Sequence, residues 1–141
     1  RTRFPRGVTL DLEVEPDIPT VNRNVELLGW VLENLLKNAM NAVDSGQGRV
    51  EVRVSPRTGT PGVVLTVRDN GRGVAAGLEE QIFRPGVSTR HRGWGLGLPL
   101  SRRIVEEYHG GRLELSWTQP GKGSEFRVTL PAAAGGPAPA E

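Results

Sequence analysis

The chain has 141 residues, of which 36% are hydrophobic and 24% are charged, which suits one packed domain and argues against wholesale disorder. It contains no cysteine, which excludes disulfides and cysteine-based metal sites, and no apolar run approaches the roughly 20 residues that span a bilayer. The formal charge of only +2 is a weak argument for nucleic-acid binding, which needs a concentrated basic patch.

Hydrophobic periodicity predicts a simple order of elements. In chain order, we expect a strand over 7–15, a helix over 24–43, strands over 49–55 and 63–69, a short helix over 77–83, a loop over 84–94, a long helix over 98–109, and a closing pair of strands over 112–117 and 125–130. This order predicts an α/β two-layer sandwich with helices on one face of a mixed sheet. The Ala/Gly/Pro-rich end, 132–141, lacks periodicity, so we expect a disordered tail after a domain over 1–131.

The first helix carries a polar stripe beside its apolar face. Asn34, Asn38 and Asn41 lie at i, i+4 and i+7, although asparagine costs roughly 0.5–0.7 kcal/mol per helical site relative to alanine. Amide oxygens suit a hard cation such as Mg²⁺, which keeps several waters and takes one or two protein ligands. The alternative is that these amides are solvated or bond neighbouring loops. Glu33 and Lys37, one turn apart, are expected to form a surface ion pair.

A second motif, Asp69-Asn70-Gly71-Arg72-Gly73, follows an apolar strand. Taken alone, it favours a tight turn, because Asp, Asn and Gly tolerate left-handed backbone. The other interpretation uses the position at the strand end. A carboxylate there can accept a hydrogen bond from an adenine amino group, and Gly73 would let the backbone pass close to the base.

A third motif, Gly93-Trp94-Gly95-Leu96-Gly97-Leu98, opens the second long helix. Glycines let backbone N–H groups face an anion, and a helix N-terminus adds a favourable partial charge. No strand leads directly into this motif, so it is not a dinucleotide-binding fingerprint, and the chain has no Walker A loop. This loop–helix junction is therefore the best candidate for a phosphate cradle.

In this order and spacing, the motifs resemble those of the catalytic ATP-binding domain of bacterial-type sensor histidine kinases. The domain belongs to the Bergerat-fold superfamily, with DNA gyrase and the heat-shock chaperone and mismatch-repair ATPases. The resemblance runs over roughly 8–131 and comprises an asparagine box at 34–38, glycine boxes at 69–73 and 93–98, a phenylalanine box at 82–85 with 88–90, the following helix at 104–111, and a closing hairpin from 123–126 to 131. It implies a mixed, mostly antiparallel sheet of about five strands covered on one face by about three helices.

The resemblance also implies a function: binding of Mg-ATP and transfer of its γ-phosphoryl group to a histidine in two-component signal transduction. Asp69 would read the adenine amino group and Asn38 would bind Mg²⁺, with Asn34 near the phosphates. Arg90, in a short lid, would meet the terminal phosphate, which makes Asn34, Asn38 and Arg90 the catalytic candidates. The remaining implied nucleotide-binding residues are Gly71, Gly73, Ser88, Thr89, Gly93, Gly95, Leu96, Gly97, Leu98 and Ser124.

Some positions depart from the family pattern. Asn41 and Ala42 replace a common basic residue and an aromatic one, Trp94 replaces a small residue, and 86–87 replaces an aromatic pair. Asn34 stands where the gyrase-like branch has a water-activating glutamate. Because an amide cannot act as a general base, we expect slow or negligible ATP hydrolysis.

The phosphate acceptor is expected outside this chain. His109 ends a helix beside Gly110-Gly111, where a structural capping role is predicted, and His91 lies in the lid. Neither has the helical acidic neighbour of the family's acceptor. We therefore expect a histidine-bearing, dimeric helical domain N-terminal to Arg1, with a response regulator as an indirect partner.

For the isolated domain we expect a monomer that contacts neither nucleic acid nor membrane. We expect the domain in the cytoplasm, either in a cytoplasmic protein or as the cytoplasmic part of a membrane-anchored sensor. Three alternatives stay open: a Bergerat-fold serine kinase of the anti-sigma type, a regulatory ATP-binding module without transfer activity, and an ATP-independent α/β domain. Trp94 and Asn41 give the regulatory module some weight.

Overall fold

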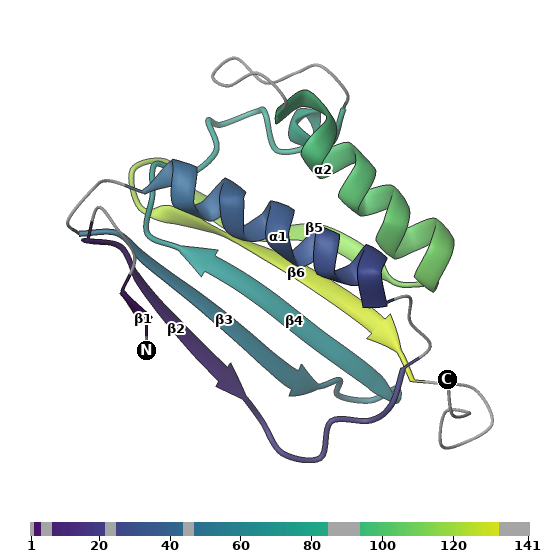
Figure 1. The fold of residues 1–141 in the computed structure, drawn as a ribbon. Coiled ribbons are helices and arrows are strands. Elements are labelled where there is room, and N and C mark those ends of the chain that lie inside the picture. Colours follow the sequence, from purple (N-terminus) through teal and green to yellow (C-terminus); the bar gives the residue numbers. More distant parts are fainter. Residues whose placement is uncertain (1, 4–6, 22–24, 44–46, 85–93, 133–141) are drawn as a thin grey trace.

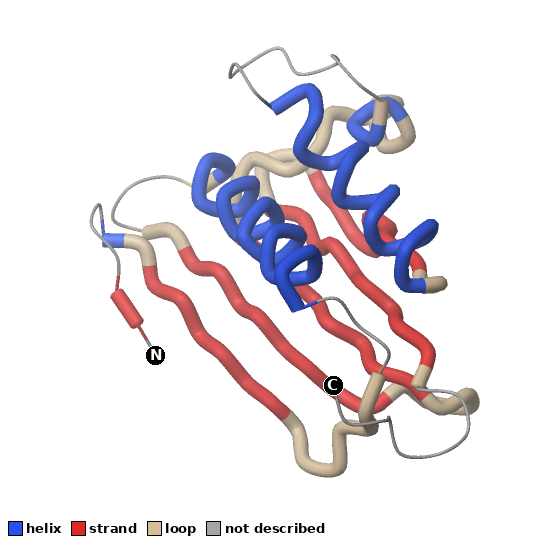
Figure 2. The backbone as a smooth tube through the Cα atoms, turned by 45° about the vertical axis from the view of Figure 1, so that its right-hand side comes forward, coloured by secondary structure: helices blue, strands red, loops and turns tan. Residues whose placement is uncertain are grey.

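The computed structural model describes residues 2–3, 7–21, 25–43, 47–84 and 94–132. A sheet forms one layer, and helices α1 and α2 lie side by side on one of its faces (Figures 1 and 2). The strands are β1 (Thr2–Arg3), β2 (Thr9–Val14), β3 (Arg49–Pro56), β4 (Gly62–Asp69), β5 (Arg112–Gln119) and β6 (Gly123–Pro131). The helices are α1 (Val25–Ala42), the 3₁₀ turn η2 (Gln81–Phe83), and α2 (Trp94–Arg103), which continues into the π-helical segment η3 (Ile104–Tyr108).

The strand order across the sheet is β1-β2-β3-β4-β6-β5. Strands β2 and β3 are parallel and every other neighbouring pair is antiparallel. The parallel pair follows from the connection, because α1 crosses over between β2 and β3 and returns the chain to the same end of the sheet. The predicted two-layer architecture with a mixed, mostly antiparallel sheet is confirmed.

The core lies between α1 and the strands beneath it. Val31, Leu35 and Ala39 lie one helical turn apart on α1, and each is only 1% exposed. Apolar strand residues that alternate along the sheet pack against this face, namely Val50, Val52, Val67, Phe126 and Val128. The residues between them face the helix-free side and form exposed ion pairs, such as Arg53 with Glu13 at 3.0 Å. Such pairs add little stability, so the helix-side core holds the sheet and helices together.

The predicted strands and the first helix agree with the structure to within about two residues at each end, but the remaining helices differ. Of the segment 77–83, only Gln81–Phe83 is helical, as a 3₁₀ turn, so the described residues contain two α-helices rather than about three. The second helix begins at Trp94, four residues before the predicted start at 98. Glycine disfavours helix by about 1 kcal/mol per residue, but packing of α2 against α1 and η2 overrides this preference.

The end of the second helix widens into the π-helical segment η3. Nδ1 of His109 lies 2.9 Å from the carbonyl oxygen of Ile104, and the residue is 8% exposed. The N–H of Gly111 donates to the carbonyl of Val105 at 3.0 Å. His109 therefore helps to end the helix, which confirms its predicted structural role.

Two features of the chain ends were not predicted. The two-residue strand β1 pairs with Thr9 and Leu10, and its length gives no periodic signal. Ala132, the first residue of the expected tail, bridges Val21, whereas 133–141 lies outside the described residues. None of the helices in the described ranges is long and apolar enough to cross a membrane.

Candidate functional site

Asp69, at the end of β4, is a charged residue that is only 4% exposed. The backbone N–H of Gly71 donates to its Oδ1 at 2.8 Å, and the backbone N–H of Ser124 also donates to the carboxylate. Burial raises the pKa of Asp69 to about 6, against the opposing effect of these N–H groups and of the nearby Arg72 and Arg68. Because a perturbed, buried carboxylate is costly to maintain, it is a strong candidate for a functional group.

The glycines after Asp69 allow close backbone approaches. A Cβ added to Gly71 would collide with the carbonyl oxygen of Ala42, the last residue of α1. Gly73 has φ +75°, and a Cβ there would collide with the carbonyl oxygen of Gln119 in β5. This loop is thus pressed between the end of α1 and the β5–β6 hairpin. The predicted contact of Gly73 with an adenine base remains a prediction.

Arg72 links three elements around this loop. Its Nη1 donates to the carbonyl oxygen of Asn41 at 2.9 Å, and its backbone N–H donates to that of Ala42 at 3.1 Å. These carbonyls belong to the last turn of α1 and lack partners within the helix. The carbonyl oxygen of Arg72 accepts from the N–H of Gly121, in the β5–β6 turn, at 2.7 Å. Sequence reasoning did not single out this residue.

Thr118, which sequence reasoning also missed, connects the loop to Ser124. Its Oγ1 accepts from the N–H of Val74 at 2.8 Å and lies 3.1 Å from the carbonyl oxygen of Gly123 and 2.9 Å from Oγ of Ser124. A hydroxyl has one proton, so Thr118 can donate to Gly123 while Ser124 donates to Thr118. In that arrangement the lone pairs of Ser124 stay available to a ligand beside Asp69. A single threonine in a strand carries no motif that could have revealed this.

The three asparagines of α1 have different surroundings. Asn34 donates from Nδ2 to the carbonyl oxygen of Trp30 at 2.9 Å, and its Oδ1 faces α2, where a Cβ on Gly97 would lie 3.0 Å away. Asn38 is half-buried, and its side chain makes no hydrogen bond to another described residue. Asn41 is exposed and donates to the carbonyl oxygen of Lys37 at 2.9 Å. The structure therefore brings Asn34 to the second glycine box and leaves the amide of Asn38 available.

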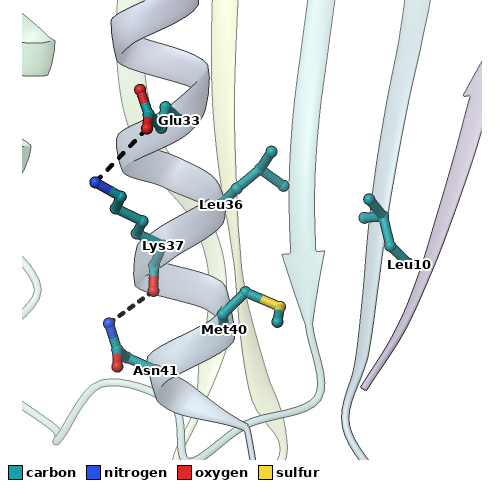
Figure 3. Close-up of a pocket in the computed structure, with 6 residues that line it drawn as sticks. All are labelled: Leu10, Glu33, Leu36, Lys37, Met40 and Asn41. Carbon is teal, nitrogen blue, oxygen red and sulfur yellow. Dashed lines mark hydrogen bonds and ion pairs between the residues drawn. The ribbon is translucent and has the colours of Figure 1, made fainter. Parts of the chain in front are cut away.

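A groove of about 230 Å³ lies beside α1 at β2 (Figure 3). Leu36 and Met40 point toward Leu10 across it, while the polar side chains lie along α1. Nζ of Lys37 lies 3.6 Å from Oε2 of Glu33, and both side chains are more than 60% exposed, so the predicted surface ion pair is confirmed. Glu33 is thus an exposed residue paired with Lys37 one turn later.

Several predicted site residues belong to the segment 85–93, which is outside the described residues. Ser88, Thr89, Arg90 and Gly93 lie outside the described residues, as do His91 and 86–87. Gly95 and Leu96 belong to the first turn of α2, and Leu98 is 7% exposed in the hydrophobic core. The other predicted site residues lie on the helix-covered side of the sheet. Asn34 lies next to Gly97, Gly71 packs against the end of α1, and Asp69 is paired with Ser124.

A family model described as "Histidine kinase-, DNA gyrase B-, and HSP90-like ATPase" matches residues 24–134. The fold and the site together define this class, and the chain belongs to that family. Within it, the chain is a catalytic ATP-binding domain of the sensor histidine kinase type.

Curated relatives agree with this assignment. The C4-dicarboxylate transport sensor protein DctB of Rhizobium meliloti is 40% identical over 132 residues, which cover 92% of this chain and 20% of that protein. The nitrogen regulation protein NtrY of Azorhizobium caulinodans is 37% identical, with coverage of 89% and 16%. Sensor histidine kinase ZraS of Escherichia coli is 36% identical, with coverage of 89% and 26%. The chain thus spans about a quarter or less of the length of these relatives.

Solved structures show the same fold. The catalytic domain of histidine kinase ThkA superposes with a TM-score of 0.77 at 26% identity, covering 89% of this chain and 80% of that chain. Full-length ShkA in complex with AMPPNP superposes with a TM-score of 0.78 at 29% identity, covering 96% of this chain and 27% of that chain.

Proposed function

We propose that this domain binds Mg-ATP and transfers the γ-phosphoryl group to a histidine on a separate, dimeric helical domain of the full-length protein. A response regulator would receive the phosphoryl group in turn, and the reaction would take place in the cytoplasm. The observation that carries the proposal is the buried Asp69 carboxylate, held at the end of β4 by N–H groups of Gly71 and Ser124.

Asp69 suits recognition of adenine. A buried carboxylate accepts strong hydrogen bonds, and the exocyclic amino group of adenine is a donor. With a pKa of about 6, the carboxylate is mostly ionised at neutral pH. Ser124, directly opposite Asp69 on β6, adds a second polar group at the same edge of the site. These two side chains distinguish adenine from a base that presents a carbonyl oxygen at that position.

Asn38 fits the role of a Mg²⁺ ligand. Among the residues that the structure describes, no group of three acidic, histidine or cysteine side chains could hold a metal ion. A magnesium ion here would therefore rely on ATP phosphates, water and a neutral oxygen, which is a usual donor set for Mg²⁺. The available amide of half-buried Asn38 supplies that oxygen. When bound, the ion would neutralise charge on the phosphates.

The arrangement favours transfer over hydrolysis. Phosphoryl transfer depends mainly on positioning and charge stabilisation, which the first turn of α2 and Asn34 could supply at the phosphates. Hydrolysis would need a base to activate water, and the Asn34 amide has no such capacity. Glu33, the nearest carboxylate in the sequence, is exposed and paired with Lys37.

The acceptor is proposed to lie on another domain. His109 is buried and its Nδ1 is engaged by the carbonyl oxygen of Ile104, so it is poorly placed to receive a phosphoryl group. The relatives are several times longer than this chain and therefore have room for further domains.

The test combines this chain with the proposed histidine-bearing helical domain, produced from the same gene, in the presence of γ-phosphate-radiolabelled ATP and Mg²⁺. Acid-labile, base-stable label on that domain is expected, and it should disappear with EDTA or with Asp69→Asn. Acid-stable label would indicate the serine-kinase alternative. Tight binding of ATP with no label on the partner would instead support the regulatory module, and stoichiometric label on this chain alone would contradict a separate acceptor.

A further inference from the structure

Arg102 of α2 is stacked on the ring of Phe83. Its guanidinium carbon lies 4.0 Å from the ring centroid, a cation–π contact. The ring of Phe83 in turn meets that of Phe126 on β6, with centroids 6.1 Å apart and an interplanar angle of 80°. Phe83 and Phe126 are 9% and 2% exposed. This stack, in which the two rings are buried and the Arg102 side chain is 33% exposed, joins α2, η2 and the sheet.

Arg102 also fastens α2 to the edge of the sheet. Its Nε donates to the carbonyl oxygen of Leu113 at 3.2 Å, and Oε2 of Glu106 accepts from the N–H of Leu113 at 3.4 Å. Nε of Arg102 lies 3.5 Å from the same Glu106 oxygen. Strand β5 is the last strand of the sheet, so the outward N–H and C=O of Leu113 have no neighbouring strand to pair with. Arg102 and Glu106 satisfy both groups.

These contacts hold the C-terminal end of α2 against η2 and β5. Gly97 is five residues before Arg102, roughly 7–8 Å along the helix axis, and it faces Oδ1 of Asn34 on α1. A shift of Arg102 relative to Phe83 or Leu113 would therefore displace Gly97 relative to Asn34. Asp69 and Ser124, by contrast, are held by the β4–β6 pairing, whereas the polar contacts of Arg102 are with Leu113 and Glu106.

We propose that Arg102 is a positioning residue for the phosphate half of the nucleotide site, an inference that rests on the proposed function. By holding α2 against Phe83 and the β5 edge, it keeps the glycine-rich first turns of α2 aligned with the asparagine box. It contributes to the affinity for the ATP phosphates, while adenine recognition at Asp69 is independent of it.

The neighbouring Arg103 provides a matched control. It also pairs with a glutamate one turn later, with Nε 3.2 Å from Oε1 of Glu107. Its side chain is 64% exposed, and it stacks on no aromatic ring among the described residues. Arg102→Gln and Arg103→Gln therefore remove the same charge and a similar helical ion pair, but only Arg102→Gln removes the stack and the bond to Leu113.

The test is calorimetric titration of the unmutated chain and both variants with Mg-ATP and with adenosine, which lacks phosphates. For Arg102→Gln, Mg-ATP affinity is expected to fall about tenfold while adenosine affinity changes less than about twofold. Arg103→Gln should change neither. The ratio of the two affinities is informative because a loss of stability alone lowers the folded fraction equally for both ligands.

A second measurement tests the coupling without nucleotide. Urea unfolding of Arg102→Gln, Phe83→Leu and the double variant should be non-additive, because each single change already removes the stack. Additive effects, or equal losses of Mg-ATP and adenosine affinity, would overturn the role of Arg102 and leave the proposed function intact. Failure of the unmutated chain to bind Mg-ATP would overturn the proposed function, and the nucleotide part of this inference with it.

Discussion

Asp69 and Ser124 stand opposite each other on β4 and β6, and the backbone N–H of Ser124 donates to the Asp69 carboxylate. The β5–β6 hairpin thus partly offsets the cost of burying the Asp69 carboxylate. The compensation is incomplete, since burial still raises the pKa of Asp69 to about 6. Asp69 therefore reduces stability at neutral pH in exchange for an acceptor in the proposed adenine site.

Replacement of Asp69 by asparagine should separate binding from stability. The amide cannot supply a charged acceptor, so we expect ATP affinity to fall about 100-fold. Ionised Asp69 costs the folded state about 3 kcal/mol at pH 7, from the rise in its pKa. The variant should therefore be at least as stable as the unmutated chain. Calorimetry with ATP and urea unfolding at pH 7 measure the two effects.

Glu13→Gln is the control for this change, because Glu13 is 63% exposed on the helix-free face and pairs with Arg53. It should alter neither quantity appreciably. A clear loss of stability in Asp69→Asn, with ATP affinity retained, would contradict the assignment of Asp69 to adenine.

Adenosine binding should depend on pH through Asp69. The ionised carboxylate is the better acceptor, so affinity should fall as the pH drops below about 6, approaching tenfold per pH unit. Adenosine is preferred to ATP here because it has no titrating phosphate. Titrations between pH 5 and pH 8, at about half-unit steps, would show the transition. Asp69→Asn should remove it, and a midpoint unchanged by that variant would assign the transition to another group.

Stability should change with pH in the opposite direction. The folded-state pKa of Asp69 is raised above its ordinary value of 3.8, so between these two pKa values the folded chain holds a proton that the unfolded chain releases. The contribution of Asp69 is complete below the unfolded pKa and is lost as the pH rises through about 6. The free energy of unfolding of the unmutated chain relative to Asp69→Asn should therefore decline across this window in urea titrations.

A comparison of Gly73 with Gly77 separates the cost of a left-handed backbone from the cost of a steric clash. Both have positive φ, +75° and +88°, but a Cβ on Gly73 would meet the carbonyl oxygen of Gln119, whereas a Cβ on Gly77 has open space. Gly77→Ala should cost about 1 kcal/mol, the penalty for the left-handed conformation. Gly73→Ala should cost about 2–4 kcal/mol and also lower ATP affinity, because the loop must move. Equal losses of unfolding free energy would show that the contact with β5 is not tight.

A comparison of Asn38→Ala with Asn41→Ala tests which asparagine binds Mg²⁺. Either change to alanine improves helix propensity by about 0.5 kcal/mol, so both variants should remain folded. Asn38→Ala should abolish the enhancement of ATP binding by Mg²⁺, whereas Asn41→Ala should preserve it, because that amide is exposed and bonded to Lys37. ATP titrations with Mg²⁺ and with EDTA give the enhancement. If Mg²⁺ still enhances ATP binding in Asn38→Ala, Asn38 is not the magnesium ligand.

Periodicity predicted the elements that bury an apolar face, such as α1 with Val31, Leu35 and Ala39, and the alternating strands. It failed where packing overrides local preference, as at Trp94, where a glycine-rich segment becomes helical. It also failed for η2, where the apparent helix over 77–83 shortens to one turn.

The motifs include Asp69, Gly73 and Asn34, but they did not reveal the contacts that surround these residues. Arg72 bonds Asn41 across 31 residues, and Thr118 bonds Val74 across 44. Arg102 meets Phe83 only because α2 and η2 pack together. Such contacts depend on the three-dimensional arrangement of distant segments, and no local spacing encodes them.

The short strand β1 leaves the two borders of the sheet unequally protected against other chains. It covers β2 at Thr9 and Leu10 only, and beyond that point Leu12 and Val14 are 65% and 58% exposed. Among the described residues, no strand pairs with this part of β2, and an unpaired border with apolar side chains invites a strand from another molecule. The opposite border, at Leu113, is occupied by side chains. Self-association at high concentration is therefore expected to begin at β2, and removal of Thr2 and Arg3 should lower solubility.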